Sequence, residues 1–297
     1  MNLPPSVCCP LCKCSLTEEG NSAQCRNGHC FDRAKQGYYN LLPVQQKRSR
    51  DPGDDPSMVA GRREFLDQHH YLPLSQAINS LLISHLDHSQ PGLAPVAHPQ
   101  ETRQILDCGC GEGYYTALLE HALNQQKLNH RLIGVDISKY AVRAACKRSQ
   151  NISWIVASGS KLPVEESSQD ALLCLFAPLS SNAFHRVLRP DGLLLLATAG
   201  SDHLLELRQQ IYPEVRRNAF DPLPDLSALF EPISQQLVQY RFKLTDNRTI
   251  LQLLAMTPHQ WRTDADARQR LLQLKQLEIG LDIKLHLLRA RSTDATD

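Results

Sequence analysis

The sequence predicts an α/β protein in which a parallel sheet with helices on both faces follows a small metal-binding segment. Three observations support this prediction. From about residue 64 onward, strand-like apolar runs alternate with helical patterns, which is the chain order of a parallel sheet. A glycine-rich stretch, 109–113, directly follows the first of these strands. Six of the ten cysteines lie within the first thirty residues, so the chain divides into a cysteine-rich part and a larger α/β part.

The elements of the larger part follow from its periodicity. Residues 62–86 are expected to be helical, because apolar side chains recur at helical spacing between Phe65 and Leu82. The proline-rich stretch 86–101 is an expected loop. Strands and helices then alternate, with strands at 104–108, 131–136, 152–157, 170–176 and 193–198, and helices at 114–124, 141–149, 182–188 and 204–212. After residue 212 the pattern does not decide between helix and strand.

Composition excludes several classes of protein. The 297 residues correspond to roughly two domains of ~150 residues. A hydrophobic fraction of 42% and a charged fraction of 21% are typical of globular proteins and exclude a disordered or fibrous chain. The net charge of +1 gives no general attraction to an acidic partner, so any contact with nucleic acid must be local.

No membrane span or secretion signal is expected. The richest apolar run, 193–197, is far shorter than the ~20 residues of a membrane-spanning helix. The first residues lack a basic region followed by an apolar stretch, so the cytoplasm is the expected location. Closely spaced cysteines in such a chain indicate a metal site rather than disulfides.

The cysteine-rich part predicts a zinc site. Cys9 and Cys12 form a CxxC pair, and Cys25 follows Cys12 after twelve intervening residues. Two thiolates of one tight turn and a second pair of ligands close a tetrahedron around zinc. Either His29 or Cys30 fits the spacing of the fourth ligand. A fully ligated ion has no open position and replaces a missing hydrophobic core, so its role is expected to be structural. The alternative is a set of free thiols without a metal.

The glycine-rich stretch predicts a nucleotide-like ligand. Gly109, Gly111 and Gly113 allow a sharp turn and close approach of the backbone to a ligand. Asp136 ends the next expected strand, where an acid can accept hydrogen bonds from a ribose. No lysine of a phosphate-binding loop follows, which disfavours nucleoside triphosphate chemistry. The alternative is a glycine-rich turn that binds no ligand.

These residues resemble a known superfamily. The string LDCGCGEGYYT followed by GVDIS is similar to the cofactor motifs of class I S-adenosylmethionine-dependent methyltransferases, which have a Rossmann-like sheet. Ser158 stands where that superfamily places an acid that contacts adenine, so this chain departs from the pattern there. The residues that match position by position, and that the resemblance assigns to the cofactor site, are Asp107, Gly109, Gly111, Glu112, Gly113 and Asp136.

A narrower resemblance covers most of the chain. The segments CPLC, CRNGHCFDRAKQGYYNLLPVQQKRSRDPGD, RREFLDQHHYLPL and MTPHQWR are similar to bacterial 23S rRNA guanine-N1-methyltransferases, which carry a zinc ribbon before a class I domain. The resemblance implies a zinc-ribbon RNA-recognition domain at 1–42, a basic linker and lead-in helix at 43–70, and a methyltransferase domain at 71–297. It also implies a homodimer. Its implied zinc ligands are Cys9, Cys12, Cys25 and His29, and it adds Tyr71 and His203 to the cofactor site. Without the resemblance, Tyr71 would be taken as a core aromatic residue and His203 as a surface residue at a helix end.

A basic stretch suggests where RNA binds. Six lysines and arginines and one acid lie between residues 26 and 50, with Phe31, Tyr38 and Tyr39 among them. Basic groups neutralise phosphates and aromatic rings stack on unpaired bases. The alternative is a solvated linker with core aromatics. Arg62 and Arg63 extend the same basic face. The candidate RNA contacts are Lys35, Lys47, Arg48 and Arg50.

The reaction that the resemblance implies is methylation of N1 of one guanine in a hairpin of 23S rRNA, with S-adenosylmethionine as methyl donor. N1 lies on the pairing edge, so the base must be unpaired or flipped. The expected strand at 170–176 is followed by a segment in which Phe176 or the carbonyl of Ala177 is a candidate to hold the base, and no catalytic residue is assigned. One alternative is a small-molecule methyltransferase whose ribbon is a docking module. Another is a zinc-ribbon protein that binds S-adenosylmethionine without catalysis.

Overall fold

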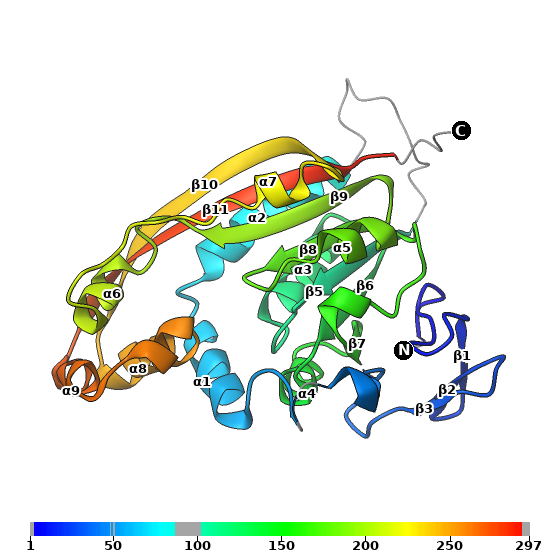
Figure 1. The fold of residues 1–297 in the computed structure, drawn as a ribbon, viewed down its shortest axis with the longest axis horizontal. Coiled ribbons are helices and arrows are strands. Elements are labelled where there is room, and N and C mark those ends of the chain that lie inside the picture. Colours follow the sequence, from blue (N-terminus) through cyan, green and yellow to red (C-terminus); the bar gives the residue numbers. More distant parts are fainter. Residues whose placement is uncertain (1–2, 48, 50, 87–101, 293–297) are drawn as a thin grey trace.

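An eight-stranded sheet forms the body of the protein in the computed structural model, which describes residues 3–47, 49, 51–86 and 102–292 (Figure 1). Its strands, in spatial order, are β10 (Phe230–Leu244), β11 (Leu277–Ala290), β9 (Leu188–Ala199), β8 (Gln169–Leu175), β5 (Arg103–Cys108), β6 (His130–Asp136), β7 (Ser153–Val156) and β4 (Tyr39–Asn40). From β4 to β9 all neighbours are parallel, whereas β11 and β10 continue the sheet antiparallel. The carboxyl ends of β5, β6 and β8 therefore meet at one edge, where ligands bind in open α/β sheets.

The central strands are apolar on both sides because both faces of the sheet are covered. On β5, Ile105 packs into one core cluster and Leu106 into the other. On β9, Leu195 and Leu194 alternate in the same way. Successive side chains of a strand point to opposite faces, so such continuous apolar runs are typical of a sheet buried between two layers.

The two layers differ in composition. The first contains α2 (Leu72–Leu86), α3 (Tyr114–Gln125), α4 (Lys139–Ala145), α6 (Leu205–Ile211), α8 (Asn247–Ala255) and α9 (Ala265–Gln273). The second contains α5 (Ser181–Val187), α7 (Leu223–Leu226) and side chains of the cysteine-rich part, such as Val7, Leu16 and Leu41. The N-terminal part therefore covers sheet surface that further helices would otherwise cover.

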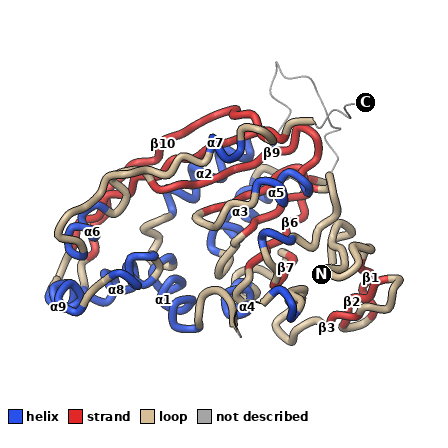
Figure 2. The backbone as a smooth tube through the Cα atoms, viewed as in Figure 1, coloured by secondary structure: helices blue, strands red, loops and turns tan. Residues whose placement is uncertain are grey.

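The N-terminal part is a small antiparallel sheet of β1 (Leu16–Glu19), β2 (Ser22–Cys25) and β3 (Cys30–Asp32). It lies at one end of the long axis of the molecule, and α6, α8 and α9 lie at the other (Figures 1 and 2). The backbone N–H of Cys8 donates to the carbonyl of Pro163 at 2.9 Å. The strand β4 pairs with β7, with Tyr39 opposite Ile155. The division of the chain at residue 42 stays a prediction, since β4 connects the two parts through the main sheet.

The one long helix predicted at 62–86 is two helices, α1 (Pro56–Leu66) and α2. Asp55 caps α1, because its carboxylate accepts from the N–H groups of Ser57 and Met58. His69, with a φ of 63°, separates the two helices. A left-handed residue cannot continue a right-handed helix, and the apolar periodicity does not reveal it.

The other elements predicted before residue 212 are confirmed, with ends that differ by a few residues, and β9 starts earlier than expected, at Leu188. After residue 212 the chain forms α7, the long strands β10 and β11, and between them α8 and α9. Short 3-10 turns lie at Val44–Gln46, Gly159–Lys161 and Pro258–Arg262. The predicted loop 86–101 lies almost entirely outside the described residues. Among the described helices, none is long and apolar enough to cross a membrane.

Candidate functional site

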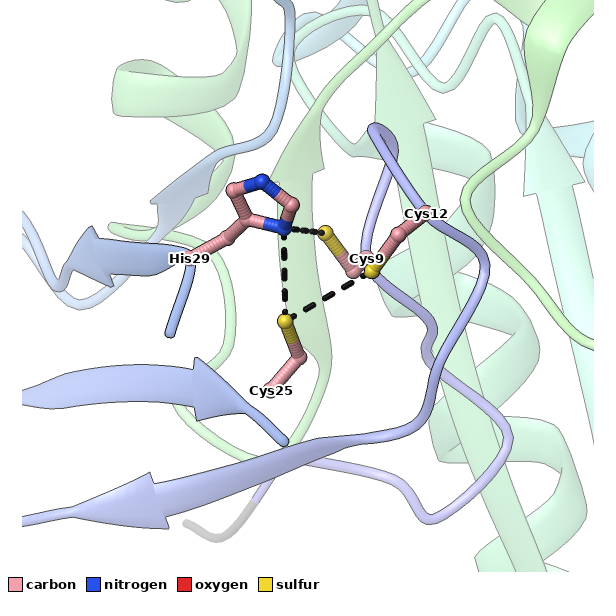
Figure 3. A group of neighbouring side chains, drawn as sticks. All are labelled: Cys9, Cys12, Cys25 and His29. Atoms are coloured by element: carbon pink, nitrogen blue, oxygen red, sulfur yellow. Dashed lines mark hydrogen bonds between the residues drawn. The ribbon is translucent and has the colours of Figure 1, made fainter. Parts of the chain in front are cut away.

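The side chains of Cys9, Cys12, Cys25 and His29 converge between the turn before β1 and the end of β2 (Figure 3). Their ligand atoms all lie within 4.8 Å of one another. The sulfurs of Cys12 and Cys25 are 3.6 Å apart, and Nδ1 of His29 lies 3.5 Å from the sulfur of Cys9 and 3.4 Å from that of Cys25. Bonds of about 2.3 Å from zinc to sulfur and 2.0–2.1 Å to nitrogen give tetrahedral edges of about 3.6–3.8 Å. The four residues therefore fit zinc.

Local backbone geometry prepares this cluster for a cation. A backbone hydrogen bond from Cys14 lowers the pKa of the Cys12 thiol to about 6, which favours the thiolate that zinc requires. Burial has the opposite effect on Cys9 and raises its pKa to about 11. A bound cation stabilises both thiolates. Cys30, the alternative fourth ligand, is exposed on β3 and lies outside the cluster.

The glycine-rich loop joins β5 to α3 at the carboxyl edge of the sheet. Gly109, Gly111 and Gly113 have φ values of 83°, 56° and 85°, which only glycine adopts without strain. A Cβ on Gly109 would lie 2.4 Å from that of Ala177, and one on Gly113 would lie 2.8 Å from the ring of Trp154. The loop is thus pressed against the carboxyl end of β8 and against β7, and side chains are excluded from it.

Asp136 holds the glycine loop from the neighbouring strand. One carboxylate oxygen accepts from the N–H of Gly111 at 2.9 Å, and the other accepts from the N–H of Ser138 at 2.8 Å. Burial raises the pKa of Asp136, while these two hydrogen bonds lower it. Each oxygen keeps a second lone pair, and the residue is half-buried, so the carboxylate remains able to accept from a ribose hydroxyl.

Asp107 lies beneath the loop and is 1% exposed. Its Oδ2 accepts from the hydroxyl of Thr116 at 2.5 Å, whereas Oδ1 is buried without a hydrogen-bond partner. Burial raises the pKa of this carboxyl to about 7. An unpaired buried oxygen beside a ligand loop fits a polar group that the protein does not supply.

The side chain of Glu112 is buried in an ion pair. Its carboxylate, on a residue only 2% exposed, accepts from Nε of Arg148 at 2.5 Å. Arg148 also lies 2.8 Å from the carboxylate of Asp67 and over the ring of Tyr114. The Glu112 side chain therefore fixes the shape of the loop. The cofactor contact of Glu112, which the resemblance implies, stays a prediction.

Tyr71 is part of an aromatic cluster between α2 and β10. It is 3% exposed and packs edge-on against Phe65 and Phe242, with ring centroids 5.7 Å and 6.2 Å away. Burial raises the pKa of Tyr115, near the start of α3 beyond the glycine loop, and its proximity to Tyr71 adds to this rise. The structure therefore places Tyr71 as a core aromatic residue close to the site, and its predicted contact with a cofactor stays a prediction.

His203 follows β9 and lies against β11 rather than on the surface. Its Nδ1 accepts from the N–H of Asp282 at 3.4 Å. Burial lowers its pKa to about 4, so the ring is neutral near pH 7. Gly200 is required here, because a Cβ would lie 2.2 Å from the Asp282 carboxylate. The structure shows no hydrogen bond or ion pair between His203 and the residues of the glycine loop, and its cofactor role stays a prediction.

Phe176 directly follows β8 and has a conformation that is rare for a bulky residue. Its φ is 58°, and 46% of its surface is exposed. The ring lies 6.3 Å from that of Tyr115, and the next residue, Ala177, contacts the glycine loop. The carbonyl of Ala177, the other candidate for holding a base, already lies 3.5 Å from the thiol of Cys174. Backbone strain beside a ligand loop is typical of functional residues.

The structure describes only two of the four candidate RNA contacts of the basic stretch. Lys35 is exposed and Lys47 is half-buried, whereas Arg48 and Arg50 lie outside the described residues. The interpretation of Tyr39 as a stacking residue is wrong, because it is 4% exposed on β4 and its hydroxyl donates to Glu18 at 2.8 Å. Phe31 and Tyr38 also pack partly against the two core clusters. The RNA contacts predicted for Lys35, Lys47, Arg48 and Arg50 stay predictions.

The sequence did not reveal that the linker around Gly53 and Asp54 packs next to Asp136. Gly53 packs on Ile137 and Ser138 beyond Asp136, and the Ser138 hydroxyl donates to the carbonyl of Asp54 at 2.6 Å. Arg62, grouped with the basic RNA face in the sequence, instead has its guanidinium beside Gly111. The glycine in the string DPGDD is a signal for this close approach, since it requires a φ of 83°.

Two protein families match parts of the chain. The zinc-ribbon family described as "RlmA, N-terminal" matches residues 7–50, and the family described as "Methyltransferase domain" matches residues 105–192. The first match contains all four residues of the zinc cluster, and the second contains the glycine loop and Asp136.

Three known proteins are similar to this chain over most of their length. The 23S rRNA (guanine(748)-N(1))-methyltransferase of Streptomyces fradiae is 32% identical, and the match covers 88% of each chain. A protein of Micromonospora griseorubida, provisionally named 23S rRNA (guanine-N(1)-)-methyltransferase, is 32% identical over 89% of each chain. A Bacillus subtilis protein with a similar provisional name is 30% identical, with 93% of this chain and 94% of that protein covered.

Proposed function

The chain belongs to the 23S rRNA (guanine-N(1)-)-methyltransferase family, and on this basis we propose that it methylates N1 of one guanine in a hairpin of 23S rRNA. The observation that carries the proposal is that the similarity runs through the zinc ribbon, the linker and the sheet alike. A small-molecule methyltransferase would need only the sheet. The ribbon and its basic surface therefore favour an RNA substrate over the small-molecule alternative.

S-Adenosylmethionine supplies a methyl group on a positively charged sulfur, which is strongly electrophilic. The protein residues proposed to hold it are the glycines of the loop, Asp107 beneath them, and Asp136 at the ribose. The positive φ values of the glycines, the unpaired Oδ1 of Asp107 and the remaining lone pairs of Asp136 support this assignment. Tyr71, Glu112 and His203 complete the proposed cofactor site on the strength of the resemblance.

The target guanine must leave its base pair before it reacts, because N1 carries a proton and lies on the pairing edge. We propose that Phe176 holds the extruded base, since its half-exposed ring lies at the edge where β5 and β8 end. Transfer forms the N1–methyl bond, breaks the sulfur–methyl bond and releases the N1 proton. Alignment of the base with the methyl group supplies much of the rate acceleration.

No catalytic side chain is assigned to the removal of this proton. Glu112 is held by Arg148, and Nδ1 of His203 already accepts from a backbone N–H. Both side chains are better explained by the structure of the site than by proton transfer.

Zinc is structural in this proposal. Its four ligands fill the tetrahedron, so it has no position for water or substrate. Lys35, Lys47, Arg48 and Arg50 are the proposed RNA contacts beside the ribbon, the cytoplasm is the proposed location, and a homodimer is proposed from the resemblance alone. Light scattering of the purified protein tests the oligomeric state.

Primer extension on unmodified 23S rRNA tests the reaction. Methylation at N1 blocks Watson–Crick pairing, so reverse transcriptase should stop one nucleotide before the modified guanine. A single new stop that requires both the protein and S-adenosylmethionine establishes the activity and its position. If zinc-loaded protein that binds the cofactor gives no stop on rRNA or on ribosomal particles, the proposal is wrong.

A further inference from the structure

The guanidinium of Arg62 lies over the glycine loop. A Cβ on Gly111 would be 3.7 Å from its Nη1. Burial raises the pKa values of Asp136, which holds the loop, and of Tyr115, which follows it, and the charge of Arg62 offsets part of both rises. These independent relationships place a positive charge at the side of the loop that faces the linker. From the sequence alone, Arg62 is expected only to extend a basic face that binds RNA.

The partner of Arg62 is a carboxylate of the linker. Arg62 and Asp54 form an ion pair, and each side chain is 24% exposed. Arg148, a second arginine at the loop, is neutralised by Glu112 and Asp67. Among the described residues, Arg62 therefore forms its ion pair with the half-buried carboxylate of Asp54, on a segment that lies beside the proposed cofactor site.

We infer that Arg62 binds the carboxylate at the amino-acid end of S-adenosylmethionine and that Asp54 occupies Arg62 when no cofactor is bound. The inference rests on the proposed function. The cofactor carries one carboxylate, and a half-buried carboxylate requires a cation or several hydrogen-bond donors. The planar guanidinium binds such a group with two parallel hydrogen bonds.

The backbone around Asp54 is anchored in a way that allows Arg62 to exchange the Asp54 carboxylate for that of the cofactor. Its carbonyl accepts from the Ser138 hydroxyl at 2.6 Å, and Gly53 packs against Ser138. The segment is thus anchored, and the Asp54 side chain can rotate away while its backbone stays in place. In the free protein Asp54 competes with the cofactor for Arg62, so removal of its charge should strengthen cofactor binding.

Calorimetric titration of the full-length protein tests the inference. The ligands are S-adenosylhomocysteine, which keeps the amino-acid carboxylate, and 5′-methylthioadenosine, which lacks it. Arg62→Gln should weaken S-adenosylhomocysteine about 10- to 100-fold, the range for hydrogen bonds to charged groups, and leave methylthioadenosine unchanged. Arg62→Lys should recover part of the loss.

Asp54→Asn should bind S-adenosylhomocysteine several-fold more tightly. Arg248→Gln, which breaks an ion pair between α8 and α1, is the matched control and should bind both ligands as wild type does.

The outcomes separate this inference from the proposed function. If wild-type protein binds neither ligand, the cofactor assignment itself is wrong. If wild type binds both and Arg62→Gln weakens both equally, or neither, Arg62 does not bind the carboxylate. Weaker binding by Asp54→Asn would show that Asp54 positions Arg62 and does not compete with the cofactor. Thermal unfolding of each variant excludes a loss caused by misfolding.

Discussion

Arg148 forms an ion pair with the buried carboxylate of Glu112, and this pair holds the glycine loop in place. The Arg148 side chain is only 13% exposed and the Glu112 side chain 1%. Desolvated pairs of this kind add little net stability when intact, but removing one partner leaves an uncompensated charge. The pair therefore acts mainly on the geometry of the loop.

Glu112→Gln should destabilise the protein by on the order of 3 kcal/mol, because Arg148 then loses its buried partner. Urea unfolding measures this change. The affinity of the folded variant for S-adenosylhomocysteine should fall by less than the stability does, because the Glu112 side chain is engaged with Arg148 and acts on the ligand only through the shape of the loop. Glu64→Gln, which breaks a surface pair with Arg248, should cost no more than about 1 kcal/mol. An unchanged stability together with a large loss of affinity would contradict the structural role.

Periodicity and motif spacing predicted the sheet, the loop and three zinc ligands because each depends on neighbours in sequence, whereas only the resemblance chose His29 over Cys30. The helix break at His69 was not predictable, since it depends on one backbone angle rather than on the apolar pattern. The burial of Tyr39 depends on the pairing of β4 with β7, more than a hundred residues away. The contact of Arg62 with Gly111 and the ion pair of Arg148 with Glu112 also depend on the fold, because each joins residues of different elements.

Loss of one zinc ligand should release the metal. His29→Ala and Cys25→Ser should lower zinc content, measured by atomic absorption, from about one ion per chain to near zero, because three ligands bind zinc weakly. Cys30→Ser is the matched control and should keep its zinc, since Cys30 is exposed and outside the cluster. Zinc loss in Cys30→Ser with retention in His29→Ala would instead make Cys30 the fourth ligand.

Asp107 should make stability depend on pH in a predictable direction. Burial raises its pKa to about 7 in the folded protein, against about 3.9 in the unfolded chain. Between these values the folded state binds a proton that the unfolded state does not, so this contribution to stability is present at low pH and is lost as the pH rises towards 7. Asp107→Asn lacks this dependence.

The free energies of unfolding of wild type and Asp107→Asn should therefore move apart between pH 4 and pH 8. The shift favours the variant at the higher pH, by up to about 4 kcal/mol for a pKa difference of about three units. Urea unfolding of the cofactor-free proteins at both pH values measures it. Asp225→Asn, at an exposed position on α7, should show no such shift. A constant difference between wild type and Asp107→Asn would mean that Asp107 is ionised throughout.

Charge reversal beside the ribbon should weaken RNA binding. The double variant Lys35→Glu, Lys47→Glu should bind a 23S rRNA hairpin more weakly, and the slope of log affinity against log salt should fall by roughly 0.7–0.9 for each phosphate that the protein no longer neutralises. Filter binding over a salt series measures both. Lys275→Glu, exposed beyond α9, is the control. Unchanged RNA affinity and slope in the double variant would exclude this surface from RNA binding.

Phe176 offers a test in which stability and activity should change in opposite directions. Its left-handed backbone costs a bulky residue roughly 1–2 kcal/mol, a cost that glycine does not have. Phe176→Gly should therefore be as stable as wild type or up to about 1 kcal/mol more stable, although it loses a half-buried ring. Its kcat/KM on rRNA should fall roughly 5- to 150-fold, the range for loss of one base–aromatic stack.

Two further variants separate the ring from the backbone at this position. Phe176→Ala keeps the left-handed conformation, so it should lose the same activity without the gain in stability, while Phe176→Tyr should keep most of the activity because its ring still stacks. Affinity for S-adenosylhomocysteine should not change in any of the three, since the ring is assigned to the base and not to the cofactor. If Phe176→Gly kept full activity, the strained conformation of Phe176 would have no part in holding the guanine.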